Sequence, residues 1–152
     1  MKNFYRIILA ISVLTLSVSC GKKGDEGPVV SDKIVAEWHL LSVSGMSSVP
    51  QVYVEFAKDL SFELYQKIGE GRYRKYEGTY TVAGDVVSGT YADEVKWGSG
   101  YKASFDGEKL VLTAQNVSAE VCTYEKKALS ETDKADALLV TKSLEEDCPR
   151  FL

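Results

Sequence analysis

Hydrophobic and polar residues alternate along most of this chain, with a larger apolar side chain at every second position. The pattern is clearest at residues 53–80, where alternating runs flank a polar turn at 58–61 and a glycine-flanked turn at 69–71. A period of two places apolar side chains on one face of a strand and polar side chains on the other. Gly78 lies within the third run and fits a bend or a bulge. The larger residues expected to share the inward face are Phe56, Phe62, Leu64, Tyr76 and Tyr80.

The same alternation recurs along the rest of the chain. It predicts strands at residues 34–43, 51–57, 61–67, 72–82, 86–91, 97–105, 109–114 and 119–127. No link between them is long enough for a helical crossover, so neighbours in sequence are expected to pair antiparallel. A sandwich is one solution, but a uniform meander favours closure, because closure removes exposed edges. We therefore predict an all-β, eight-stranded antiparallel up-and-down β-barrel over residues 33–129.

The region that follows the barrel, residues 130–152, carries a helix signal. Ser130 is followed three residues later by an aspartate, which resembles a capping box. Apolar residues at helical spacing then predict a short C-terminal α-helix from about residue 131 to residue 143. Its Leu138 and Leu139 are expected to pack on the barrel or across one mouth. The remainder is an acidic tail.

The N-terminal segment, residues 1–19, is expected to be a lipoprotein signal peptide. A basic start precedes an apolar run at residues 7–19, which is too short to span a bilayer. Small residues then lead to Cys20 in a pattern that resembles the lipobox of bacterial lipoproteins, with Ser17 in place of the usual leucine. The resemblance implies cleavage before Cys20 and lipidation of that residue. An ordinary secretory signal with an incidental cysteine is the alternative.

Residues 20–32 are rich in glycine and charge and include a proline, so we expect a flexible tether. The sequence KGDE at residues 23–26 resembles the acidic export signal of some Bacteroidota lipoproteins that reach the outer cell surface. A lipid on the cysteine would hold the protein on a membrane, because each buried methylene contributes about 0.8 kcal/mol. These features imply an outer membrane lipoprotein that faces either the periplasm or the cell surface.

Composition and residue types exclude several kinds of function. A net charge of −4 without a basic stripe makes nucleic acid a poor partner, because phosphate contacts dominate such binding. His39 is the only histidine and lies on the strand face opposite Trp38, so neither a catalytic triad nor a zinc site has enough candidate residues. Glu55, Glu63 and Glu77 can face one another across adjacent strands, but we expect them to be solvated. We predict no enzyme activity, no cofactor and no metal.

The cysteines suggest a covalent link. If Cys20 is lipidated, Cys122 and Cys148 remain as an even pair in an oxidising compartment. A disulfide between them would tie the C-terminal tail to the last strand. The alternative is a buried free Cys122 and an exposed Cys148.

Aromatic and other large apolar residues on in-register faces form the candidate ligand site. An eight-stranded barrel is just wide enough to fill itself with side chains or to hold one small ligand. Rings and tyrosine hydroxyls suit an apolar or amphipathic ligand, and a fully packed interior is the alternative. The candidate residues are Trp38, Phe56, Phe62, Leu64, Tyr76, Tyr80, Trp97 and Tyr101.

Several of these segments together resemble the lipocalin-like domain lipoproteins of gut Bacteroidota. Besides the lipobox they are VAEWHL at 35–40, YVEF at 53–56, SFELYQ at 61–66, GTYTV at 78–82 and LVLT at 110–113. The sequence AEW at 36–38 is similar to the Gly-x-Trp of lipocalin first strands, with alanine in place of glycine. The resemblance covers about residues 33–127 and implies a small calyx-like barrel without established catalytic residues.

The lipobox, the barrel and the aromatic residues lead to one functional hypothesis. It is a membrane-anchored lipocalin-like lipoprotein that binds a small apolar or amphipathic ligand at one mouth of the barrel. The alternative is a protein-interaction or accessory module of the cell envelope, with a filled barrel and no ligand. That module would use the acidic tail and loop tips such as residues 45–50.

Overall fold

The structure is a computed structural model and describes residues 29–142 and residue 152. Several features predicted from the sequence lie outside the described residues. These are the signal peptide, the Cys20 lipidation site, most of the tether, Cys148 and most of the acidic tail.

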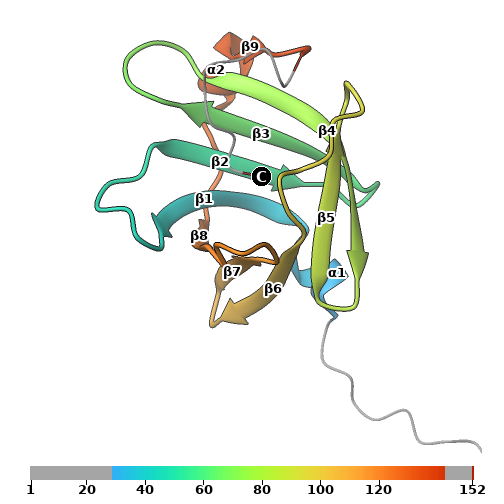
Figure 1. Ribbon diagram of the computed structural model, residues 1–152. Coiled ribbons are helices and arrows are strands. Elements are labelled where there is room, and N and C mark those ends of the chain that lie inside the picture. Colours follow the sequence, from blue (N-terminus) through green and yellow to red (C-terminus); the bar gives the residue numbers. More distant parts are fainter. Residues whose placement is uncertain (1–28, 143–151) are drawn as a thin grey trace, which may run out of the picture.

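Within the described residues, eight antiparallel strands close into an up-and-down barrel, which confirms the predicted fold (Figure 1). Each strand pairs with its neighbours in sequence, and the pairing of the first strand with the eighth completes the circle. The strands are β1 (Ala36–Val43), β2 (Gln51–Phe56), β3 (Ser61–Lys67), β4 (Arg74–Ala83), β5 (Val86–Tyr91), β6 (Tyr101–Asp106), β7 (Lys109–Ala114) and β8 (Val121–Lys126).

A bulge in β1 changes which residues face the interior. Trp38 and Leu40 point inward, and the register against β8 then shifts between Leu40 and Ser42. The extra residue shifts the alternation of inward and outward side chains by one position. Val43 is therefore only 2% exposed, whereas Leu41 is 37% exposed.

The seam between β5 and β6 is short, with register pairs only at Val86–Lys102 and Val87–Tyr101. The chain from residue 92 to residue 100 instead follows the edge of β5 through a bridge between Thr90 and Lys96. This path carries Trp97 to the barrel wall, where its side chain is buried. The prediction that a strand begins at Trp97 was therefore wrong, because the residues that precede Tyr101 form a loop.

A single helical turn, α1 (Val30–Lys33), lies at one end of the barrel (Figure 1). Ile34 follows it and is completely buried, and its backbone oxygen accepts a hydrogen bond of 2.7 Å from the indole of Trp38. The predicted tether therefore stops before Val30 rather than at residue 32. None of the described helices is long and apolar enough to cross a membrane.

The predicted C-terminal helix is present as α2 (Glu131–Asp136) but is shorter than expected. Its N-cap is Ser130, whose hydroxyl accepts the backbone N–H of Asp133 at 3.1 Å, as the capping signal predicted. The backbone becomes extended at Ala137, so the helix ends well before residue 143.

The two leucines expected on the helix form the short strand β9 (Leu138–Leu139), which pairs parallel with β4 at Arg74 and Lys75. There it covers an edge of β4 that β5 leaves free, because the pairing of β5 begins at Gly78. The leucine side chains are 46% and 52% exposed. The prediction that they pack on the barrel was wrong, because backbone pairing with β4 fixes them in an extended conformation.

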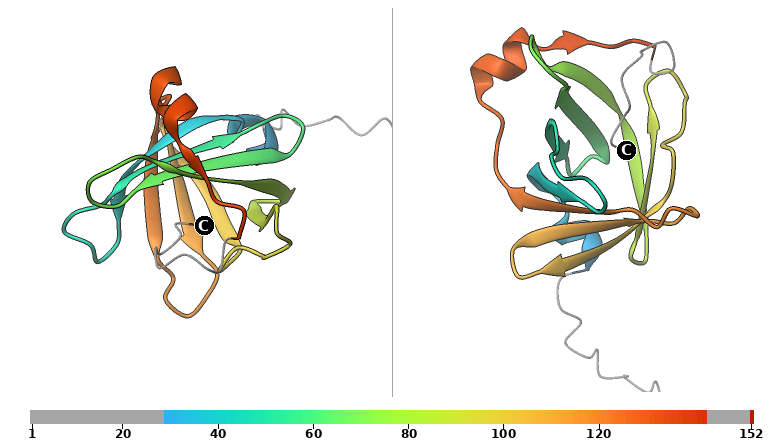
Figure 2. Two further views of the ribbon diagram at one scale, coloured as in Figure 1. Left: turned by 90° about the horizontal axis from the view of Figure 1, so that it is seen from above. Right: turned by 60° about the vertical axis from the view of Figure 1, so that its left-hand side comes forward.

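A second, smaller apolar cluster lies on the outer face of the barrel. Tyr53, Tyr65 and Leu129 are its buried members, and Tyr73 and Ala137 pack against it. The segment around α2, which lies outside the barrel wall in both views of Figure 2, supplies the leucine and the alanine. These two residues provide the packing that was expected from the leucines of β9.

Gly78 is required by the close approach of β4 and β5. A Cβ atom added there would lie 2.1 Å from the backbone oxygen of Thr90 and 2.8 Å from Cα of Tyr91. Because neither contact is the end of a flexible side chain, the strands would have to separate. We expect Gly78→Ala to lower the free energy of unfolding by about 1–3 kcal/mol, measured by urea denaturation.

The matched control for this variant is Gly98→Ala. An added Cβ at Gly98 meets nothing within 4 Å, so we expect a change within about 0.5 kcal/mol. Equal stability of the two variants would contradict the close contact at Gly78.

Candidate ligand site inside the barrel

The residues predicted to line a ligand site all belong to one buried cluster inside the barrel. The largest exposed fraction among them is 8%, at Tyr101. The structure therefore brings the predicted set together, while its role in ligand binding stays a prediction. The set is Trp38, Phe56, Phe62, Leu64, Tyr76, Tyr80, Trp97 and Tyr101.

Aromatic rings fill the end of the barrel beside the β2–β3 hairpin. Phe56 and Phe62 lie opposite each other on those strands and contact Trp97 with ring centroids 6.3 and 5.0 Å apart. Phe56 also packs on Tyr80 at 5.0 Å, and these pairs have the edge-to-face geometry that aromatic rings prefer. The hydroxyl of Tyr80 donates to the backbone oxygen of Ala57 at 2.8 Å.

Trp97 reaches this cluster because β5 has a glycine beneath it. A Cβ atom added at Gly89 would lie 2.2 Å from the indole ring, so any larger residue would displace it. The inward position of Trp97 was predicted, but for the wrong reason. It follows from the space at Gly89 rather than from strand alternation.

Buried polar groups lie in the part of the interior away from the β2–β3 hairpin. Burial raises the pKa of Tyr101 and of Cys122 to about 12, and it raises the pKa of Tyr124 well above its ordinary value. All three groups are therefore protonated and uncharged near neutral pH. They offer O–H or S–H donors inside a space that is lined mainly by apolar groups.

Cys122 carries a free thiol and is 1% exposed. The predicted Cys122–Cys148 disulfide is therefore not formed in the structure, and Cys148 lies outside the described residues. The physical reason is the direction of the Cys122 side chain, which the alternation along β8 points into the barrel. Its Sγ atom lies 3.8 Å from Oε1 of Glu120. A partner thiol would have to enter the barrel to reach it.

Two buried donors in the interior, among the described residues, lack a strong hydrogen-bond partner. Nε1 of Trp97 has none, and the hydroxyl of Tyr124 has only the weakly bonding thiol of Cys122 beside it. An unpaired buried donor costs about 1–3 kcal/mol, so native proteins rarely keep one without a reason. A ligand that carries acceptor oxygens would satisfy such groups.

Leu152 lies inside the barrel although it belongs to none of the strands. It is 3% exposed and is part of the same core cluster, and Figures 1 and 2 show this end of the chain within the ring of strands. Its backbone oxygen accepts a hydrogen bond of 2.8 Å from the hydroxyl of Tyr91. Tyr91 in turn contacts the rings of Phe62 and Tyr76, with centroids 5.6 and 6.0 Å apart.

Sequence reasoning missed both partners of this hydrogen bond. Tyr91 could have been found, because it continues the alternation of inward residues from Val87 through Gly89. No sequence signal marks Leu152, which reaches the interior through tertiary structure alone.

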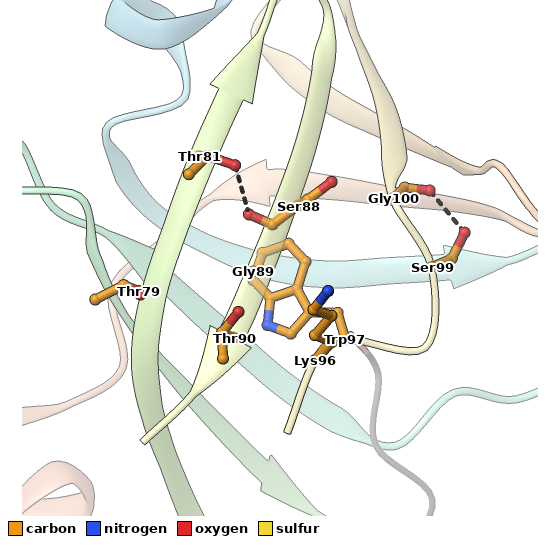
Figure 3. Close-up of a pocket in the computed structure, with 9 residues that line it drawn as sticks. All are labelled: Thr79, Thr81, Ser88, Gly89, Thr90, Lys96, Trp97, Ser99 and Gly100. Carbon is orange, nitrogen blue, oxygen red and sulfur yellow. Dashed lines mark hydrogen bonds between the residues drawn. The ribbon is translucent and has the colours of Figure 1, made fainter. Parts of the chain in front are cut away.

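A polar cleft of about 430 Å³ lies on the outer side of β4 and β5 (Figure 3). Trp97 lines this cleft and also packs in the inner ring cluster, so its indole forms part of the wall between the two. Lys96 lies at the same edge. The hydroxyl-bearing residues of the lining are Thr79, Thr81, Ser88, Thr90 and Ser99.

Glutamates form a row across the outer face of β1 to β4. Glu37 lies opposite Glu55, Glu55 opposite Glu63, and Glu63 opposite Glu77. The sequence predicted that Glu55, Glu63 and Glu77 would face one another in this way. Lys134 of α2 lies 2.9 Å from Glu37 and 3.3 Å from Glu55. The row is therefore partly covered by the helix and neutralised, which differs from the solvated positions expected.

Glu63 is the most constrained member of this row. Desolvation raises the pKa of its carboxyl, but hydrogen bonds from Lys75 and Tyr65, each 2.5 Å long, outweigh that effect and hold the pKa below its usual range. Lys75 also lies 3.5 Å from Glu77. An ionised, ion-paired carboxylate is unsuited to act as a general acid at neutral pH.

His39 lies on the same outer face. Its ring stacks on Tyr53 with centroids 4.5 Å apart, and its Nδ1 atom is 3.1 Å from Oε1 of Glu125. In the part of the chain that the structure describes, no group of His, Cys, Asp and Glu side chains could hold a metal ion. The absence of enzyme activity stays a prediction.

Matches to known proteins were found among solved structures and not among families or curated proteins. No protein-family model matches this chain, and no curated protein matches it. Among solved structures, the chain is similar to the crystal structure of an uncharacterized protein from Bacteroides eggerthii DSM 20697, with 17% sequence identity and a TM-score of 0.47. The match covers 62% of this chain and 99% of that one. The resemblance to lipocalin-like lipoproteins stays a prediction.

Glu63 is expected to contribute to the pH dependence of stability. Its pKa in the folded protein lies below the unfolded value of about 4.3, so its contribution is complete above that value and is lost as pH falls through the folded pKa. We expect the free energy of unfolding to fall between about pH 5 and pH 3, with a smaller slope in Glu63→Gln. Urea denaturation at a series of pH values measures the slope.

The exposed Glu108 provides the matched control. Glu108→Gln makes the same change of charge away from the row, so we expect it to keep the wild-type slope. A wild-type slope in Glu63→Gln as well would show that the hydrogen bonds of Glu63 do not stabilise the fold.

Proposed function

We propose that the barrel binds a small apolar or amphipathic ligand in its interior. The observation that carries the proposal is Leu152, a residue from outside the strands that lies among the interior side chains. The strand residues therefore leave space for at least one further aliphatic group. A barrel of eight strands is of the size that can hold one small ligand.

The lining of this space also supports an amphipathic ligand. The rings of Phe62, Tyr76 and Tyr91 supply apolar surface, while Trp97 and Tyr124 present donors without a strong acceptor among the described residues. Ligand sites commonly combine an apolar lining with a few polar groups that orient the ligand.

The second candidate function is a protein-interaction or accessory module of the cell envelope, with a filled barrel. The tight ring packing around Phe56 favours this second function, because the rings already fill that end of the barrel without a ligand. The contact surface would then be outside the barrel. Met46 in the loop between β1 and β2 is 47% exposed, and the leucines of β9 are similarly exposed.

Tryptophan fluorescence tests the ligand proposal, because Trp38 and Trp97 both lie in the interior cluster. We expect at least one compound from a panel of fatty acids, bile acids and haem-like molecules to change the emission in a saturable way. Trp97→Phe removes one reporter and retains a ring there, so it shows which tryptophan responds. Silence across the panel would contradict ligand binding and leave the accessory module as the better explanation.

We further propose that a lipid on Cys20 anchors the protein in the outer membrane, facing the periplasm or the cell surface. The lipobox resemblance supports this, together with the exposure of Val29, where the described chain begins beside α1 at one end of the barrel (Figure 1). An anchor at that position would leave the barrel in the aqueous phase.

Cys20→Ser is expected to abolish lipidation and membrane association in a bacterial host, because the serine hydroxyl is not an acceptor for the thioether-linked lipid. Membrane fractionation and mass spectrometry of the N-terminal peptide measure both effects. Cys148→Ser is the matched control and should remain in the membrane fraction. A lipid-bearing, membrane-bound Cys20→Ser protein would refute the anchor.

A further inference from the structure

We infer that Trp97 is a gate in the barrel wall, whose indole swings from the interior into the polar cleft outside β5 and opens a lateral path for the ligand. The path crosses the seam between β5 and β6. This gate rests on the proposed ligand-binding function, and it determines how the interior site is reached.

The seam between β5 and β6 is the shortest join in the barrel. It has two register pairs, whereas each of the other seven seams has between four and six. Beyond Val87, the edge of β5 is covered by the returning loop, whose Trp97 donates its backbone N–H to the oxygen of Gly89 over 3.0 Å. The indole packs directly against Gly89. A single side chain, rather than a neighbouring strand, therefore closes the wall at this point.

The inward position leaves a polar atom of Trp97 unsatisfied. Its Nε1 atom is buried without a hydrogen-bond partner, which is an unfavourable state for a donor. Edge-to-face contacts with the rings of Phe56, Phe62 and Tyr101 oppose this cost, with centroids 6.3, 5.0 and 6.1 Å from the indole. Ring packing therefore favours the inward position, and the unpaired indole N–H opposes it.

The cleft outside β5 can receive the indole and satisfy its N–H. Its volume is about 430 Å³, and it is lined by hydroxyl-bearing residues. Figure 3 shows the nitrogen edge of the indole on the side of Thr90. Thr90 lies opposite Thr79, and Thr81 is two residues farther along β4. An outward swing therefore exchanges ring packing for a hydrogen bond from Nε1 to a threonine hydroxyl, and Thr90 is the nearest candidate.

The inward and outward positions of the indole form a two-state element. The inward state is the major one, because it keeps three ring contacts. In the minor, outward state the wall is open beside Gly89, which has no side chain to fill the gap. A ligand enters and leaves in that state, and the indole closes behind it. The rates of entry and exit therefore depend on the outward population, whereas the affinity does not.

Hydrogen exchange of the two indole N–H groups in the full chain tests the swing without a ligand. Trp38 is the internal reference, because it is completely buried and its Nε1 donates to the backbone oxygen of Ile34 over 2.7 Å. We expect the indole N–H of Trp97 to exchange at least about tenfold faster, with little dependence on dilute urea, since a local swing exposes little surface. NMR records both signals, and Trp97→Phe assigns them.

The expected difference between the two tryptophans has a clear opposite. Equal exchange rates with the same dependence on urea would show that Trp97 leaves the interior only when the whole barrel unfolds. That result would overturn the gate.

Thr90→Val removes the hydroxyl that would receive the indole and keeps the branched shape of the side chain. We expect exchange of the Trp97 indole N–H to slow about two- to tenfold, because the outward state loses one hydrogen bond. Thr81→Val is the matched control, since it makes the same change farther along the same cleft, and it should keep the wild-type rate. An unchanged rate in Thr90→Val would contradict an outward state held by this threonine.

Ligand kinetics test the path, with dodecanoate as the probe and stopped-flow tryptophan fluorescence as the measurement. Thr90→Val should lower the association and dissociation rate constants together, by about the same two- to tenfold factor as the exchange rate, and leave the dissociation constant unchanged. Thr81→Val should leave both rate constants at the wild-type values. A changed dissociation constant with an unchanged association rate constant would show that Thr90 acts on the bound ligand rather than on a gate.

The outcomes distinguish the gate from the proposed function. Equal indole exchange overturns the gate while ligand binding stands. Faster exchange of Trp97, combined with unchanged dodecanoate rates in Thr90→Val, overturns the lateral path, and the ligand then enters through a mouth of the barrel. Absence of dodecanoate binding in every variant also overturns the path, and the proposed function is then decided by the wider panel of ligands.

Discussion

The pairing of β1 with β8 is the constraint on which the rest of the structure depends. It joins Trp38 to Lys126 and Val43 to Cys122, and it turns an open sheet with two edges into a barrel with an inside. Once the circle is closed, every second side chain must enter a space whose width is set by the number of strands. The choice of residues at those positions then decides whether the space is filled.

The residues at the inward positions divide the interior into two parts. The rings around Phe56 and Phe62 occupy the end beside the β2–β3 hairpin, so that end provides stability rather than volume. Tyr101, Cys122 and Tyr124 bring polar atoms into the other part of the same space. Hydroxyl burial there has a cost that an apolar residue would avoid, which separates this part of the lining from ordinary core.

Alternation in the sequence was sufficient to predict the barrel and the inward direction of residues such as Leu64 and Tyr76, because alternation is local and repeats along every strand. The errors arise where distant segments decide the outcome. The bulge that turns Val43 inward forms against β8, and β9 forms because β4 has a free edge. Leu152 enters the core through a contact with Tyr91, sixty-one residues away, which no local pattern encodes.

The ligand-binding proposal requires that the interior occupant exchange, whereas the accessory module has no such requirement. Among the described residues, one hydrogen bond holds Leu152 and contributes about 0.5–1.5 kcal/mol net, and burial of its side chain contributes about 1.5–3 kcal/mol. A ligand present at about 100 to 1,000 times its dissociation constant supplies roughly 2.7–4.1 kcal/mol. These ranges overlap, so a ligand of ordinary affinity has enough free energy to replace Leu152.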